Sequence, residues 1–325
     1  MLSGRLMLES ESSRSAGGSW NGTPVSTPTV SVVLATRNRP EHARLCWASI
    51  LENQGMLELI VVDQSDGGAT EEALSSLTDP RLRYVRTAAR GVTSGRNLGI
   101  ESSRGDVVAF TDDDCRVPRD WVERLTRIFG ADPDAAVVCG RVRVPPEIWN
   151  GGYASSFEPR ERVWQGRFPP PNSDWGITSN LSVRRPVLAS VGVFDPVLGA
   201  GAPLLSGGET DFLFRVLKAG RKVVNASEVE VDHLGVRRPG AETRDLIRGY
   251  GVGISAALMK HVRLGDAGAI RLYLRWLGWL VRVVASNLVR GRRPLGVGFA
   301  LSFLAGARAS FRFRIDRVRR LYVPT

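Results

Sequence analysis

Cysteine is scarce in this chain, and so is any pattern that would give it a structural role. There are three cysteines, Cys46, Cys115 and Cys139, and none of them has the CxxC spacing of a metal or redox site. An odd number also argues against a disulfide framework, so a reducing compartment is the default expectation. Residues 1–18 lack an apolar stretch, and we therefore expect no secretory signal.

Lysine is almost absent, because only three of the 44 basic residues are Lys and the others are Arg. The net charge of +11 suggests an acidic partner, but the charge is unevenly placed. Residues 244–325 hold 16 basic and three acidic residues, whereas residues 1–243 carry a net charge of −2. We expect a near-neutral body without a nucleic-acid partner, followed by a cationic C-terminal region.

The 325 residues are 43% apolar, which is sufficient for a packed core. Residues 1–28 are rich in Ser, Gly, Thr and Pro and predict a disordered lead-in. Beyond them, short β-branched runs alternate with helical segments, which predicts a mostly parallel α/β sheet. The expected strands are 30–35, 57–62, 82–85, 107–111 and 179–183, and the expected helices are 40–53, 69–77, 93–103 and 209–219, the last capped by Gly220.

Polar clusters follow three of these strands, at residues 36–38, 63–66 and 112–114. The carboxyl ends of parallel strands are where open sheets bind ligands, so the three clusters predict one site. Asp112, Asp113 and Asp114 would repel one another unless a cation neutralised them. Carboxylate oxygens suit Mg²⁺ or Mn²⁺, and Mg²⁺ commonly shares its coordination with substrate phosphates.

Seven motifs along residues 29–238 resemble those of family 2 glycosyltransferases with the GT-A fold, in the same order and spacing. They are VVLATRNRP at 32–40, IVVD at 60–63, GRNLGI at 95–100, FTDDD at 110–114, SNLSVRR at 179–185, VGVFD at 191–195 and GETDFLFR at 208–215. The resemblance implies an inverting transfer of a sugar from a UDP-, dTDP- or GDP-linked donor to a hydroxyl acceptor, a glycan or a glycolipid.

The resemblance also implies roles for individual residues. Asp63 would contact the base or ribose, with Thr36 and Asn38 beside the base and with Arg96 and Asn97 near the nucleotide. Asp112 would face the ribose, Asp113 would bind the nucleotide, and Asp114 would hold the metal. His233 corresponds to a position where GT-A enzymes often have a metal or diphosphate ligand, although an ordinary strand-end histidine fits the sequence equally well. Trp175 and Asn180 would face the acceptor or the donor sugar.

Glu209 matches the position of the catalytic base of the family. Because this chain has Glu209-Thr210-Asp211 where the family more often has Glu-Asp, both Glu209 and Asp211 stay candidates. A carboxylate there would remove the proton of the acceptor hydroxyl as it attacks the anomeric carbon. Either residue could instead be only a cap favoured by the helix dipole.

The stretch 141–178 is rich in Pro, Gly, Trp and Arg, and we interpret it as a loop that covers the acceptor. Residues 29–240 would then form the catalytic domain, and residues 241–325 a basic helical region. Residues 269–289 have helical periodicity with their Arg residues on one side, and the uncharged run 295–307 has 13 residues, short of the roughly 20 that span a bilayer. This favours helices on an anionic membrane surface at the cytoplasmic face, and the alternative is a helical cap on the core.

Three other functions fit the sequence less well. A sugar-phosphate nucleotidyltransferase has a related core, but it would need a Gly-rich loop after the first strand, where this chain has Ala35-Thr36-Arg37-Asn38. A catalytically inactive nucleotide-sugar-binding protein at the membrane would not need both Glu209 and the Asp112–Asp114 cluster. An NAD-binding enzyme fails because no GxGxxG follows the first strand.

Overall fold

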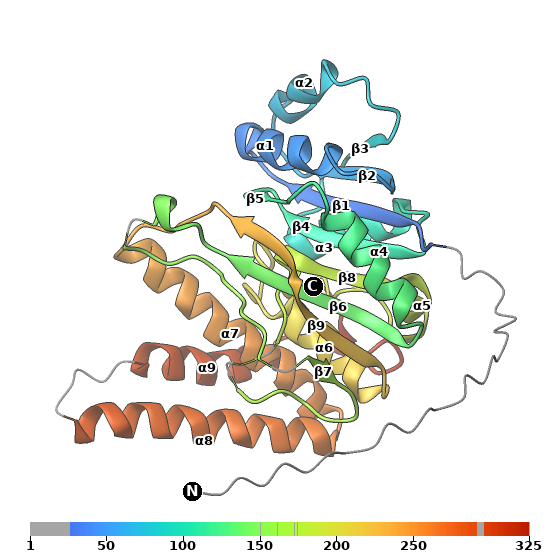
Figure 1. The fold of residues 1–325 in the computed structure, drawn as a ribbon. Coiled ribbons are helices and arrows are strands. Elements are labelled where there is room, and N and C mark those ends of the chain that lie inside the picture. Colours follow the sequence, from blue (N-terminus) through green and yellow to red (C-terminus); the bar gives the residue numbers. More distant parts are fainter. Residues whose placement is uncertain are drawn as a thin grey trace, which may run out of the picture.

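The computed structural model describes residues 27–149, 151–160, 162–171, 173, 175–290 and 296–324. Most of the predicted disordered lead-in, 1–28, therefore lies outside the described residues. The described chain forms a large mixed sheet with helices around it and a group of C-terminal helices at one end (Figure 1). This architecture confirms the predicted α/β class with a C-terminal helical appendage.

The sheet has nine strands in the order β3-β2-β1-β4-β8-β6-β9-β5, and β7 pairs with β9. The first four strands of this order are parallel, whereas β8 runs antiparallel to both of its neighbours, β4 and β6. The strands are β1 (Val30–Thr36), β2 (Met56–Asp63), β3 (Leu82–Arg86), β4 (Val107–Asp112), β5 (Cys115–Arg116), β6 (Ala135–Arg143), β7 (Val163–Trp164), β8 (Leu181–Arg184) and β9 (Lys222–His233).

Strands β1, β2 and β4 form the centre of the core because their apolar side chains are buried on both faces, as expected of parallel strands under helices. Helix α3 lies directly on β1, since a Cβ on Gly99 would overlap the side chain of Val33. The helices of this part are α1 (Pro40–Leu51), α2 (Ala69–Ser75), α3 (Val92–Ser102), α4 (Trp121–Ala131), α5 (Arg185–Val191) and α6 (Gly208–Lys218).

The strand register places the predicted polar clusters at one edge of the sheet. Thr36 of β1 is aligned with Asp63 of β2, and Ala35 is aligned with Asp112 of β4. Strand β9 reaches the same edge from the other side, because its last residue, His233, pairs with Cys115 of β5. The three acidic residues 112–114 therefore lie between two halves of the sheet.

The stretch 141–178 is more regular than predicted. Strand β6 continues through Arg143, a short 3-10 helix (Pro146–Ile148) and β7 lie within the stretch, and a second 3-10 helix (Thr178–Asn180) begins at its last residue. Isolated bridges join Val142 to Phe157 and Tyr153 to Arg237, so backbone hydrogen bonds hold this stretch against β6 and the segment after β9.

The C-terminal region consists of three helices, α7 (Ala241–Arg263), α8 (Ala267–Val289) and α9 (Val297–Ser310). They are followed by a hairpin of two short strands, β10 (Ile315–Asp316) and β11 (Leu321–Tyr322). Glycines bring α7 into backbone contact with two neighbours: a Cβ on Gly253 would overlap Ser206 just before α6, and a Cβ on Gly306 of α9 would overlap Val252. We call these contacts the glycine seam. Within the part of the chain that the structure describes, no helix has the length and apolarity needed to cross a membrane.

Candidate active site

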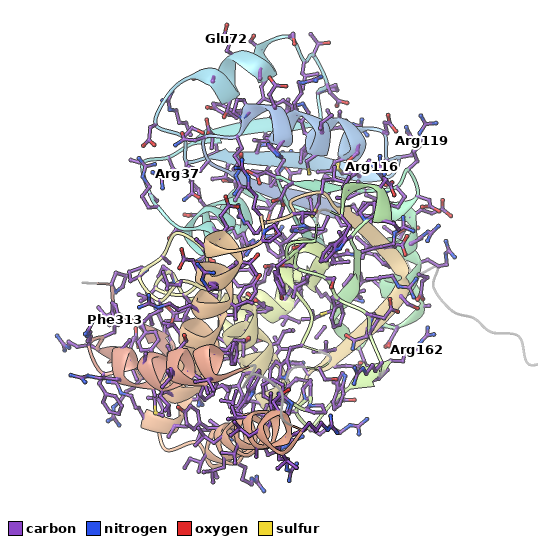
Figure 2. All side chains as sticks on the ribbon, turned by 90° about the vertical axis from the view of Figure 1, so that its left-hand side faces the viewer. Arg37, Glu72, Arg116, Arg119, Arg162 and Phe313 are labelled. Carbon is purple, nitrogen blue, oxygen red and sulfur yellow. The ribbon has the colours of Figure 1, made fainter. Side chains whose placement is uncertain are left out.

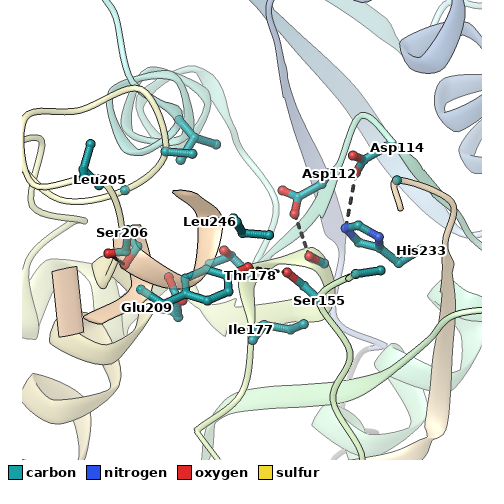
Figure 3. Close-up of a pocket in the computed structure, with 18 of the residues that line it drawn as sticks. Asp112, Asp114, Ser155, Ile177, Thr178, Leu205, Ser206, Glu209, His233 and Leu246 are labelled. Atoms are coloured by element: carbon teal, nitrogen blue, oxygen red, sulfur yellow. Dashed lines mark hydrogen bonds and ion pairs between the residues drawn. The ribbon is translucent and has the colours of Figure 1, made fainter. Parts of the chain in front are cut away.

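A cavity of about 900 Å³ opens at the carboxyl ends of β1 and β4. The sheet supplies one wall, and the start of α6 together with α7 and α8 supplies the opposite wall; Figure 3 shows Glu209 across the cavity from Asp114. Residues from the stretch 141–178 also line it. The lining residues on which the chemistry depends are Thr36, Arg39, Arg96, Asp112, Asp113, Asp114, Trp175, Ser179, Glu209, His233, Tyr250 and Trp276.

Asp112 ends β4 and faces the cavity with its charge already compensated. Arg96 of α3 forms an ion pair with Oδ1, and the Ser179 hydroxyl donates a 2.6 Å hydrogen bond to Oδ2. Burial alone would raise the pKa of Asp112, but Arg96 and Ser179 lower it below its ordinary value. Asp112 is therefore an ionised acceptor with a fixed orientation.

Asp113 is held by two residues of the β1 end. The Thr36 hydroxyl donates to its Oδ2 at 2.8 Å, and Arg39 Nη1 donates to its Oδ1 at 3.0 Å. The same Arg39 nitrogen lies 3.2 Å from Asp114 Oδ2. Burial raises the pKa of Asp113 above its ordinary value, and Arg39 opposes that shift. Arg39 thus neutralises part of the acidic cluster, a role that the sequence motif did not assign.

Asp114, in the turn between β4 and β5, lies close to His233 at the end of β9. His233 Nε2 lies 3.5 Å from Asp114 Oδ1, while His233 Nδ1 is buried without a hydrogen-bond partner. Their ligand atoms and the Cys115 sulfur all lie within 4.8 Å of one another. Burial raises the pKa of the Cys115 thiol well above its usual value, which favours the carboxylate and the imidazole as ligands. The next loop fits closely around Asp114, since a Cβ on Gly235 would overlap its Oδ2.

Glu209 lies in the first turn of α6, after Gly207, whose φ of 83° is in the left-handed region. Its side chain lines the cavity and is partly buried. Burial raises the pKa of Glu209 above the ordinary value of 4.5, and Arg96 moderates the shift. A carboxylate with a raised pKa is a better proton acceptor, which is the property that a general base needs.

Asp211, the alternative base, has entirely different surroundings. Its side chain is fully buried and does not line the cavity. It forms ion pairs with Arg215 and Lys260 and a 2.8 Å hydrogen bond with His261 Nε2. Burial alone would raise its pKa, but Lys260 and Arg215 lower it below the ordinary value, so Asp211 is a fixed charge in the interior. The geometry favours Glu209 over Asp211.

Several other predicted site residues are absent from the cavity wall. Asn97 exchanges two hydrogen bonds with the backbone of Phe194, and Asn180 accepts from Trp121 Nε1 and donates to two carbonyls of β6 and β9. These amides join elements of the fold. Asp63 accepts hydrogen bonds from the Tyr84 hydroxyl and the Ser65 backbone, and Asn38 donates one to Asp66. Neither Asp63 nor Asn38 lines the cavity. Trp175 does line the cavity, with its indole nitrogen donating to Pro170.

The C-terminal helices also contribute to the cavity, which the sequence pattern did not indicate. Tyr250 of α7 and Trp276 of α8 both line it, and the Trp276 indole nitrogen is buried without a partner. Tyr250 approaches Ser155 from the stretch 141–178. The appendage is therefore part of the site.

A sheet of this topology with carboxylates on two sides of a cavity at its carboxyl edge defines the GT-A class of glycosyltransferases. A mannosyltransferase from Pyrobaculum calidifontis, solved with GDP-Man and Mn²⁺, shares this fold at a TM-score of 0.56 and 16% identity, covering 91% of this chain and 87% of that one. TarS 1–349 of S. aureus, solved with UDP-GlcNAc, also has a TM-score of 0.56, at 14% identity, covering 89% of this chain and 94% of that one.

The sequence comparisons lead to the family. The model for Glycosyl transferase family 2 matches residues 31–190. The succinoglycan biosynthesis protein ExoM of Rhizobium meliloti is 30% identical over 224 residues, which are 64% of this chain and 67% of ExoM. This chain belongs to glycosyl transferase family 2. Glycosyltransferase AglE of Haloferax volcanii is 29% identical over 62% of this chain, which spans 66% of AglE, and a glucosyl-dolichyl phosphate glucuronosyltransferase of the same organism is 28% identical, covering 63% of this chain and 68% of that protein.

Proposed function

We propose that this protein transfers a hexosyl group, with inversion, from a nucleoside-diphosphate sugar to a hydroxyl of a glycan or glycolipid acceptor. The observation that carries the proposal is the separation of two carboxylate groups by one cavity: Asp112 and Asp114 on the sheet, Glu209 on α6. A donor bound at the sheet and an acceptor bound near Glu209 would meet from opposite sides. A single displacement in that arrangement inverts the anomeric carbon.

The residues present fit a divalent cation, Mg²⁺ or Mn²⁺. Asp114 and His233 would hold it, because their ligand atoms lie close together. The residue next to the Asp114 carboxylate is Gly235, which has no side chain that could occupy the cation's place. The imidazole nitrogen in this pair favours Mn²⁺, since Mg²⁺ prefers oxygen ligands only. When bound, the cation would stabilise the negative charge on the departing diphosphate.

The protein's own residues would act on the acceptor and on the nucleotide. Glu209 would accept the proton of the attacking hydroxyl. Burial raises the pKa of Glu209, which makes its carboxylate a better proton acceptor. Asp112, held by Arg96 and Ser179, would accept a hydrogen bond from the ribose in one fixed direction. Thr36 at the end of β1 would lie beside the base, although its hydroxyl is already used to hold Asp113.

We also propose that the acceptor is lipid-linked or part of a cell-envelope glycan, and that the enzyme works at the cytoplasmic face of a membrane. The names of relatives support this choice, since one of them is a glucosyl-dolichyl phosphate glucuronosyltransferase and another is a succinoglycan biosynthesis protein. In this proposal, residues 29–240 are the catalytic domain and residues 241–325 serve the membrane side.

The test is a panel of UDP-, dTDP- and GDP-sugars assayed with Mn²⁺ or Mg²⁺, comparing Glu209→Gln with Glu158→Gln. Both glutamates line the cavity, but Glu158 is an exposed partner of Arg141. We expect E209Q to lose roughly 10²–10⁴-fold in kcat with unchanged donor binding, and E158Q to keep its activity. A fully active E209Q enzyme would remove Glu209 as the base.

Adding nucleoside triphosphates with sugar 1-phosphates to this panel separates the alternatives. A nucleotidyltransferase would release pyrophosphate from a nucleoside triphosphate, and a glycosyltransferase releases a nucleoside diphosphate. A catalytically inactive binding protein would show a raised thermal midpoint with a nucleoside diphosphate and Mn²⁺ but no turnover of any donor.

A further inference from the structure

Helix α8 has three distinct sides along its length. At 100° per residue, Leu274, Val281 and Leu288 fall on one narrow stripe, and they are 60%, 67% and 58% exposed. Arg271, Arg275 and Arg282 form a second exposed stripe beside it, about 100° further round. Trp276 and Leu280 are buried on the remaining side. An apolar stripe bordered by arginines is the pattern of a helix that lies in a lipid interface.

Helix α9 and the two residues after it also expose apolar and basic side chains. Leu301, Leu304 and Phe311 are 63%, 55% and 65% exposed, and Arg308 and Arg312 are exposed as well. The inner sides of the two helices meet through aromatic rings, with Trp276 5.6 Å from Phe303 between ring centroids. Both helices lie at the end of the molecule opposite α2 in both views (Figures 1 and 2).

In the described part of the chain, the exposed arginines of this surface form no ion pair with an acid, and the sequence has no Asp or Glu between Ala267 and Ile315. Asp266, at the N-cap of α8, is buried and accepts hydrogen bonds from the first turn of the helix. The exposed arginines of α8 and α9 therefore keep their full charge for a partner. An anionic surface matches the charge, and only one with an apolar layer beneath it also matches the leucines.

We propose that the outer sides of α8 and α9 form one docking surface for an anionic lipid bilayer. The apolar stripe would enter the acyl boundary and the arginines would contact the headgroup phosphates. Because Trp276 on the opposite side of α8 lines the cavity, docking would bring the cavity wall close to the lipid. That a docked chain then reaches a lipid-linked acceptor rests on the proposed function; the docking itself does not.

The experiment is flotation of the full chain with phosphatidylcholine vesicles, with and without phosphatidylglycerol. The variant R271Q/R275Q/R282Q is compared with R44Q/R119Q/R127Q, which loses the same charge from exposed sites away from α8 and α9; Figure 2 shows Arg119 at the other end of the molecule from Phe313. We expect binding only to anionic vesicles, lowered on the order of 100-fold by the first variant and little changed by the second.

A third variant, L274S/V281S/L288S, tests the apolar stripe, and we expect it to weaken binding at high salt, where charge is screened. All variants should keep the thermal midpoint of the wild type, since the changed side chains are exposed. Failure of the wild type to bind anionic vesicles at low salt, or equal loss in both arginine variants, overturns the proposal. A dimer that the serine variant converts to monomer, without vesicle binding, would assign the surface to self-association instead. Vesicle binding without sugar transfer from any donor of the panel, to a glycan or to a lipid-linked acceptor, would contradict the proposed function alone.

Discussion

The ammonium of Lys260 lies 2.6 Å from Asp211 Oδ1, and both side chains are fully buried. The same ammonium lies 2.6 Å from Asp195 Oδ2, which also accepts a hydrogen bond from the backbone of Tyr322. Asp211 is two residues after Glu209 on α6, and Lys260 belongs to α7. This ionic group therefore links the candidate base, the C-terminal helices and the C-terminal hairpin.

Replacing Lys260 by Met should strongly destabilise the protein. It would leave Asp195 and Asp211 with less compensation in the interior, a change that typically costs about 3–5 kcal/mol. The measurement is the free energy of unfolding in urea. Lys222→Met is the control, because its 2.6 Å pair with Asp132 is about a quarter exposed on each side and should contribute about 0–1 kcal/mol. Equal losses in the two variants would contradict this account.

His261 should make the protein acid-sensitive. Burial lowers its pKa from 6.5 to about 4, although Asp211 favours the protonated form. The pair geometry fits a neutral ring that donates from Nε2 to Asp211 and accepts from Arg320 at Nδ1. Between about pH 6.5 and 4 the unfolded chain binds more protons at His261. The free energy of unfolding should therefore decrease as the pH is lowered through that window, by about 3 kcal/mol.

The check is a series of urea titrations over this pH range. His261→Gln should make the free energy of unfolding much less dependent on pH across this range. His42→Gln should leave the pH dependence of the wild type unchanged, since His42 is exposed. A wild-type slope that survives in H261Q would assign the acid sensitivity to other groups.

The pH profile of the transfer reaction should have an acid limb set by Glu209. Burial raises the pKa of this carboxyl above 4.5, and the base must be deprotonated, so kcat/KM should rise with pH through a midpoint above that value. Stopped assays across the acid range measure it. The residual activity of E209Q should lack this limb, and an unchanged limb in that variant would point to another ionising group.

Gly235→Ala should weaken Mn²⁺ binding without unfolding the protein. Its Cβ would overlap Asp114 Oδ2 and force the carboxylate or the loop after His233 to move. Titration calorimetry with Mn²⁺ alone measures the effect, and we expect at least a tenfold rise in Kd, in the range seen when ligand-supporting contacts are lost. The control is Gly130→Ala in α4, where a Cβ meets open space. Normal Mn²⁺ affinity in G235A would exclude Asp114 as a principal ligand.

The polar residues at the carboxyl edge of the sheet could be predicted from the sequence, because the pattern that indicates them is local. Each apolar run ends in a polar cluster, and parallel pairing then brings Thr36, Asp63 and Asp112 to the same level. The antiparallel direction of β8 could not be predicted, since it depends on how the chain returns from the stretch 141–178. Strand β6 and helix α4 were not among the expected elements, and the first residues of 141–178 are the end of β6.

The site was harder to predict where a polar side chain serves the fold. From the motifs, Asn97 and Asn180 were predicted to contact ligands. Their amides instead form hydrogen bonds with buried backbone groups of distant segments. Asp211 differs from Glu209 through its burial and its ionic partners, and two of these, Lys260 and His261, lie about 50 residues further along the chain. Such partners are set by tertiary contacts, which spacing within one motif does not contain.

The glycine seam has a mechanical consequence. Gly253 of α7 lies against the backbone and the hydroxyl of Ser206 just before α6, and Gly306 of α9 lies against the backbone of Val252. Because such close contacts leave little room for rearrangement, we expect a displacement of α9 to be passed on to the turn before Glu209. The candidate base would then respond to the position of the C-terminal helices.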